Sequence, residues 1–192
     1  MTLIPRSTFR AGLGLLALAL SAVALAVATS PAGAADHAKT APAGKYHGER
    51  RLVVRGNATA VDGPCDARVC QLKLVDGRFR GTVGSGAYSA SLKLKVGQAF
   101  PNGEGAICAP LDGRIVLGAG TPDRLVLAVA GDSCQDGAGP LEAASFTGLA
   151  QFIVTRATGS YAGVTGSGLA SFSEDAAKHH RMTLVGRVRS AS

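Results

Sequence analysis

Hydrophobic and polar residues alternate with a period of two along most of the chain after residue 48. The pattern is clearest in residues 91–96 and 125–129, where Leu or Val occupies every second position. Such alternation is typical of strands with one buried face. Similar segments, each bounded by Gly, Pro, Asp or Asn, are residues 50–55, 69–75, 114–117, 146–155, 166–172 and 181–189. We therefore predict about eight strands, and residues 174–180 offer at most one short helical turn.

Short, evenly spaced strands in a chain that contains 26 glycines favour an antiparallel sandwich or a closed barrel. We expect the barrel of about eight strands, because closure removes exposed strand edges and interior glycines allow the bends that closure needs. With no Trp, the interior should be filled mainly by Leu, Val, Ile and Ala. We expect burial of Leu92, Leu94, Leu125, Leu127, Phe152 and Tyr161. Such an interior is either filled or holds one small ligand, and the sequence does not choose.

Residues 146–172 form the most distinctive segment, a glycine-rich hairpin. Phe146, Gly148, Ala150, Phe152 and Val154 share one face of the first strand, and the turn falls at residues 157–160. The glycines of this hairpin fit turn positions with positive φ or a close approach of the backbone to an aromatic ring. A phosphate-binding loop is not expected, because strand follows strand where that site needs a helix N-terminus. The residues that define the turn and the returning strand are Gly159, Tyr161, Gly163, Gly166 and Gly168.

Residues 158–168, Thr-Gly-Ser-Tyr-Ala-Gly-Val-Thr-Gly-Ser-Gly, resemble the last long hairpin of allene oxide cyclase-like barrels, the superfamily that includes the dirigent proteins. The segments 108–110, 124–127 and 131–134 also look like the secreted bacterial members, so the resemblance covers about residues 78–188. It implies an antiparallel barrel of about eight strands. The charged pocket residues behind the cyclase and dirigent activities have no matching positions here, so the resemblance assigns no catalytic residue.

Residues 1–35 have the features of a secretory signal peptide. Arg6 and Arg10 precede an apolar run over residues 12–28, and small residues follow at Ala32, Gly33, Ala34 and Ala35. We expect cleavage next to Ala35, a disordered linker over residues 36–47 and one domain over residues 48–189. The mature protein should be secreted, with no membrane span. An uncleaved anchor is the alternative, because the apolar run is just under spanning length.

The four cysteines, Cys65, Cys70, Cys108 and Cys134, all follow the proposed cleavage site. Export places them in an oxidising compartment, so we interpret them as disulfides rather than metal ligands. Of the three possible connectivities we predict Cys65–Cys70, which would close a turn, and Cys108–Cys134, which would tie two strand ends. No metal site is expected, because the spacings do not repeat a C-x₂-C pair.

Removing Arg6 and Arg10 with the leader lowers the formal net charge from +7 to +5. This mild, dispersed charge gives no reason to expect a nucleic-acid partner. The cations on outward strand positions are Lys73, Lys93, Lys95, Arg187 and Arg189. They could form a stripe that meets an anionic cell-surface polymer or membrane, but we interpret them first as protection of a sheet edge.

Catalytic residues cannot be named from the sequence. His179 and His180 would point to opposite faces of a strand, so we interpret them as solvated residues of a loop before the last strand. Glu104, Glu142, Glu174 and Asp175 are interpreted as solvated loop residues, with catalysis open to one that enters a pocket with a raised pKa. No triad and no cofactor site are recognised.

Two function classes remain. The first is a secreted, disulfide-stabilised barrel that binds a small apolar ligand or a surface partner without catalysis, which we favour. The second is a cofactor-free cyclase, isomerase or dirigent-like enzyme that uses the barrel lumen, as the resemblance implies. An apolar pocket that holds one Glu, Tyr or Arg would favour the enzyme. The oligomeric state stays open.

Overall fold

A computed structural model describes residues 48–136 and 145–190. The predicted leader, the predicted linker and Glu142 lie outside these residues. The described chain forms β-strands, joined in places by single 3-10 turns, and confirms the predicted all-β class. The strands are β1 (Glu49–Cys65), β2 (Cys70–Gly81), β3 (Gly84–Leu94), β4 (Phe100–Pro101), β5 (Ile107–Leu117), β6 (Arg124–Asp136), β7 (Ser145–Thr158), β8 (Val164–Glu174) and β9 (His179–Ser190).

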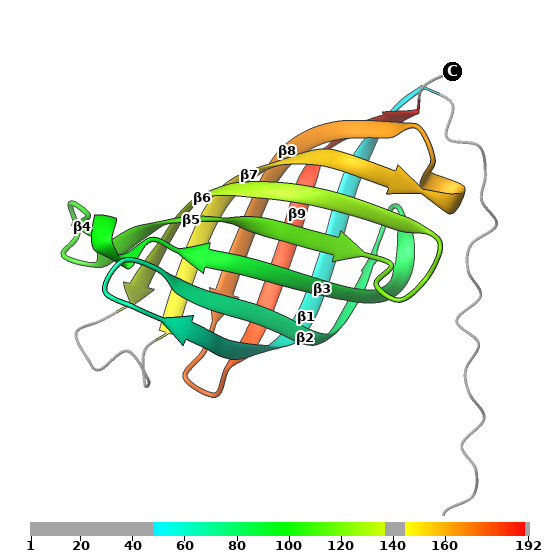
Figure 1. The fold of residues 1–192 in the computed structure, drawn as a ribbon. Helices are drawn as coiled ribbons and strands as arrows, with labels where there is room; N and C mark the ends of the chain where they lie inside the picture. The colour runs from blue at the N-terminus through cyan, green and yellow to red at the C-terminus, as the bar shows by residue number, and fades with distance from the viewer. Residues whose placement is uncertain (1–47, 137–144, 191–192) are drawn as a thin grey trace, which may run out of the picture. The chain divides into compact units, whose positions relative to one another are not determined.

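The strands close into an antiparallel barrel (Figure 1). The hydrogen-bonded order is β3-β2-β1-β9-β8-β7-β6-β5, and pairing of β3 with β5 completes the ring. The short β4 is an extra strand. It pairs with the first residues of β5, which precede the part of β5 that pairs with β3. Because β2, β3 and β9 are hydrogen-bonded on both sides, the interpretation of Lys73, Lys93, Arg187 and Arg189 as edge protection is wrong.

Several strands are longer than the alternation of the sequence predicts. The strand predicted at residues 50–55 continues to Cys65, because the register shift between Asn57 and Thr59 interrupts the period of two without ending the pairing. Val96, predicted to lie in a strand, belongs instead to the 3-10 turn η1 (Val96–Gln98). Lys95 therefore lies beyond the end of β3, where its ammonium is 2.8 Å from Asp112.

One hydrophobic core fills most of the interior. Leu92, Leu125, Leu127 and Phe152 are buried as predicted. Leu94 and Tyr161 are only partly buried, because Leu94 ends β3 and Tyr161 ends the 3-10 turn η3 (Gly159–Tyr161). Aromatic side chains fill more of the interior than expected: Phe79, Tyr88, Phe152 and Phe172 join the aliphatic residues.

The glycines of the hairpin make close packing possible. Gly159 and Gly163 have φ angles of +61° and +78°, which side chains rarely adopt. Gly168 lies opposite Gly186 on β9, and a Cβ on either would come within 2.8 Å of the Phe152 ring. The paired glycines therefore leave the space that the ring of Phe152 fills.

Candidate functional site

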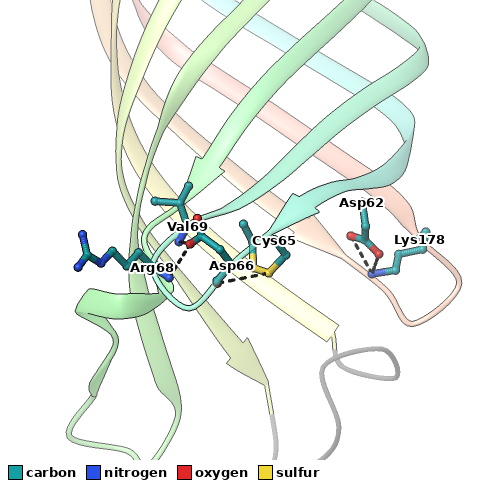
Figure 2. The surroundings of a disulfide bond; sticks show 7 residues. Asp62, Cys65, Asp66, Arg68, Val69 and Lys178 are labelled. Atoms are coloured by element: carbon teal, nitrogen blue, oxygen red, sulfur yellow. Dashed lines mark hydrogen bonds and ion pairs between the residues drawn. A yellow bond between two sulfur atoms is a disulfide. The ribbon is translucent and has the colours of Figure 1, made fainter.

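The two disulfides of the structure are the pairs that the sequence analysis predicts. Cys65 joins Cys70 across the turn between β1 and β2, and we call this bridge the hairpin disulfide. Cys108 joins Cys134, its direct partner on the neighbouring strand, and this bridge is the strand disulfide. In the hairpin turn the Asp66 carboxylate accepts backbone hydrogen bonds from Arg68 and Val69, at 2.7 and 2.8 Å (Figure 2). These bonds lower the pKa of Asp66.

A pocket of about 310 Å³ opens at the end of the barrel where the hairpin disulfide lies. Its wall is mostly apolar and comes from strands on all sides of the ring, because the inward residues near each strand end converge there. The apolar side chains are Leu72, Leu92, Leu94, Val96, Leu111, Phe146 and Phe172. The polar and charged ones are Asp62, Gln71, Ser133, Thr147, Ser173, Glu174, Lys178 and His180. The interior is thus filled along most of its length and hollow at one end.

Glu174 and His180 enter this pocket, which corrects the sequence interpretation of both as solvated loop residues. Glu174 is the last residue of β8 and is 7% exposed, and His180 is the second residue of β9 and is 3% exposed. They are direct partners in the β8–β9 ladder, so their side chains lie on the same inner face. The turn between them is a hairpin turn, in which Lys178 has a φ of +64° and donates its N–H to the carbonyl of Asp175.

The alternation of inward and outward side chains along a strand could have identified both Glu174 and His180 as inward-facing residues. Ala170 and Phe172 are buried, so Glu174 continues the inward series of β8. His180 likewise begins the inward series of β9, which continues through Met182 and Leu184. The polar composition of residues 173–180 obscured this signal in the sequence.

Glu174 carries an ionisable group in an apolar surrounding. Burial raises the pKa of Glu174, and the ammonium of Lys178, 3.3 Å from the carboxylate, only partly offsets this. Lys178 also pairs with Asp62 at 3.2 Å (Figure 2). Burial works to lower the pKa of Lys178, but the hydrogen bond to Asp62 and the charge of Glu174 outweigh it and raise that pKa. The lysine therefore remains a cation held between two carboxyl groups at the rim.

His180 is neutral at neutral pH. Burial lowers its pKa to about 4, and its ring lies 5.6 Å from that of Phe172. Its Nδ1 atom is buried without a hydrogen-bond partner among the described residues. A neutral imidazole directly across the ladder from a carboxyl group with a raised pKa is an arrangement that can accept and return a proton.

The remaining sequence candidates lie elsewhere. Glu104 is exposed in the loop after β4, as the sequence predicts. Asp175 is exposed and accepts N–H bonds from His179 and Ala177, and the His179 bond is the main cause of its lowered pKa. The His179 ring is exposed, with Nδ1 3.1 Å from Asp175. The structure therefore separates the adjacent histidines, one outside and one in the pocket.

Neither a metal site nor a membrane-spanning helix is found in residues 48–136 and 145–190. In this part of the chain no group of three or more His, Cys, Asp or Glu side chains could hold a metal ion. No helix here has the length and apolar character to cross a bilayer.

Comparison of the chain with protein-family models, with curated proteins and with solved structures found no match.

Proposed function

We propose that the protein is exported and holds one small, largely apolar molecule in the pocket at the end of its barrel. The observation that carries this proposal is the cavity of about 310 Å³ with an apolar wall and a few convergent polar groups. Ligand pockets typically have volumes of about 300–1,000 Å³ and this kind of lining. The leader sequence and the two disulfides support export. The barrel also agrees with the proposed likeness to allene oxide cyclase-like proteins.

The pocket favours a ligand with an apolar body and one uncharged polar group. Leucine and phenylalanine side chains surround the body of such a molecule, and Glu174 and His180 meet its polar end. A ligand carboxylate would approach the carboxyl groups of Glu174 and Asp62, with the Lys178 cation already paired to both. A hydroxyl or carbonyl group avoids that repulsion.

Displacement of a fluorescent apolar probe, N-phenyl-1-naphthylamine, tests the proposal. Ser133 lines the pocket opposite Gly148, so a larger side chain there has room to occupy the cavity. We expect Ser133→Phe to weaken probe binding by at least about tenfold, because the new ring takes the space of the ligand. The matched control is Ser171→Phe, which adds the same ring on the exposed face of β8. Equal binding by both variants and the parent would contradict a site inside the barrel.

A cofactor-free isomerase or cyclase is the second candidate, favoured by one observation. Glu174 is buried, has a raised pKa and lies across the ladder from neutral His180. In this role Glu174 would take a proton from one carbon or oxygen of the ligand and return it to another, with no net change in the ligand's composition.

Glu174→Gln distinguishes the enzyme from the carrier. Gln keeps the size of the side chain and removes the titratable carboxyl group. The molecules that copurify with the parent and with the variant are compared by mass and chromatographic retention. An enzyme would give isomers of equal mass and different retention, whereas identical molecules on both proteins would support the carrier.

A further inference from the structure

The outer wall of the barrel carries a basic surface that the pocket does not involve. It covers the outer faces of β1, β9 and the neighbouring β8, and its exposed arginines, which come from β1 and β9, are Arg51, Arg55, Arg181, Arg187 and Arg189. We call it the arginine face. Over residues 49–57, 165–171 and 181–189, Glu49 is the one acidic side chain, and it accepts a hydrogen bond of 2.6 Å from Arg187.

The arrangement of these arginines is not explained by folding. Arg51 lies directly opposite Arg187 in the β1–β9 ladder, and like charges in such positions repel each other. All three strands are hydrogen-bonded on both sides, so the cations guard no edge. An open hollow of about 430 Å³ lies beside this pair, lined by Glu49, Arg50, Arg51, Val185, Gly186 and Arg187. The guanidinium groups of Arg51 and Arg187 lie on the outer face of this hollow, and paired guanidinium groups suit a phosphate group.

A row of exposed or half-buried apolar residues crosses the arginine face. Val53 on β1, Val185 on β9 and Leu169 on β8 are successive partners across the ladders. Val185 is 40% exposed and Leu169 is 52% exposed. On β7 the direct partner of Leu169 is Gln151, and Ile153 and Leu149 lie on either side of Gln151 on the same outer face, at 56% and 60% exposure. Arginines lie on both sides of the apolar row. The pair Arg51 and Arg187 lies two residues along the strands on one side of Val53 and Val185, and Arg55 lies two residues along β1 on the other side.

We propose that the arginine face binds the surface of an anionic lipid bilayer, with the apolar row entering the interface and the arginines contacting lipid phosphates. Peripheral membrane binding combines burial of apolar side chains with attraction of Lys and Arg to anionic lipids. A soluble polyanion would use the arginines and leave the apolar row in water. A second copy of the chain, packed face to face, would bring two sets of arginines together with only Glu49 from each copy to balance them. The proposal does not depend on the pocket.

Sedimentation with vesicles tests this surface. The parent should bind vesicles of phosphatidylglycerol and phosphatidylcholine and should not bind phosphatidylcholine alone. Arg51→Ser with Arg55→Ser should weaken binding about 25-fold, because each basic residue at an anionic bilayer contributes about fivefold. The matched control, Lys73→Ser with Lys93→Ser, removes two exposed cations from β2 and β3 and should change binding less than about twofold.

The apolar row separates the bilayer from the other partners. Leu169→Ser with Val185→Ser should weaken vesicle binding at least about tenfold, because insertion loses apolar burial. Unchanged vesicle binding by this variant, together with competition by inorganic polyphosphate, would identify a polyanion surface and overturn the proposal. A parent that does not bind vesicles but self-associates through Leu169 and Val185 would identify an interface between copies, and would also overturn it. Equal losses in the lysine control would show general charge attraction without a defined face.

Discussion

His180 should make the fold acid-sensitive over a defined pH range. Its ordinary pKa of 6.5 applies to the unfolded chain, and burial lowers the pKa to about 4 in the folded protein. Because the folded pKa is the lower one, the neutral ring favours folding fully above pH 6.5, and this contribution is lost as the pH falls towards 4. The two pKa values predict a loss of about 2 kcal/mol at pH 5 and about 3 kcal/mol at pH 4.

The measurement is the free energy of unfolding in urea at several pH values between 7 and 4, for the parent and His180→Asn. Asn does not titrate, so the variant should lack the loss assigned to His180. Its stability at pH 7 should also fall, because the ring packed against Phe172 is removed. The readout is therefore the slope with pH rather than the absolute stability. Glu174, Lys178 and Asp62, the charged groups that line the pocket beside His180, are present in both proteins.

The adjacent His179 provides the matched control. Its ring is exposed, so His179→Asn should keep the pH dependence of the parent. A parallel loss of stability in the parent and in His180→Asn between pH 7 and 4 would show that His180 does not cause the acid sensitivity. An NMR titration that gave His180 a pKa near 6.5 would show the same.

Three further predictions concern stability. Gly168→Val should destabilise the protein by at least about 3 kcal/mol, because the new Cβ would lie 2.3 Å from the carbonyl oxygen of Val185. The outward-facing Ser167→Val should change the melting temperature little, and equal melting of the two variants would contradict the packing. Replacing both cysteines of the hairpin disulfide by Ser should cost about 2 kcal/mol, and of the strand disulfide about 3.5 kcal/mol, since their sequence separations are 5 and 26. A reversed order in urea unfolding would argue against the chain-entropy explanation. Tyr161→Phe should cost about 1 kcal/mol, because the hydroxyl donates a hydrogen bond of 2.5 Å to the Val83 carbonyl. An unchanged urea midpoint would show that this bond adds nothing to stability.

The fold could be predicted from the sequence because the patterns that indicate strands and turns are local. Alternation of Leu and Val indicates strands wherever one face is buried, and the glycine hairpin gives both the turn and the space for Phe152. Strand ends were predicted less well. A bulge near Ala58 interrupts the alternation in β1, so the sequence showed only the first part of a strand that continues to Cys65.

The pocket was not accessible from the sequence. Its volume depends on how far apart β1, β3, β6 and β8 lie at one end of the ring, and these strands are distant along the chain. Glu174 and His180 were misplaced for a different reason. The polar composition of this segment suggested a loop. In the structure the alternation of inward and outward side chains continues to Glu174, the last residue of β8, and the inward positions of β9 begin at His180.

Native mass spectrometry of the protein purified from its native host shows whether the pocket holds a small molecule. We expect the parent and Ser171→Phe to carry one additional small molecule per chain, and Ser133→Phe to carry none. The same mass retained on Ser133→Phe would place the ligand outside the pocket. Bare protein in all three samples, together with no uptake of apolar probes, would contradict a ligand-binding barrel.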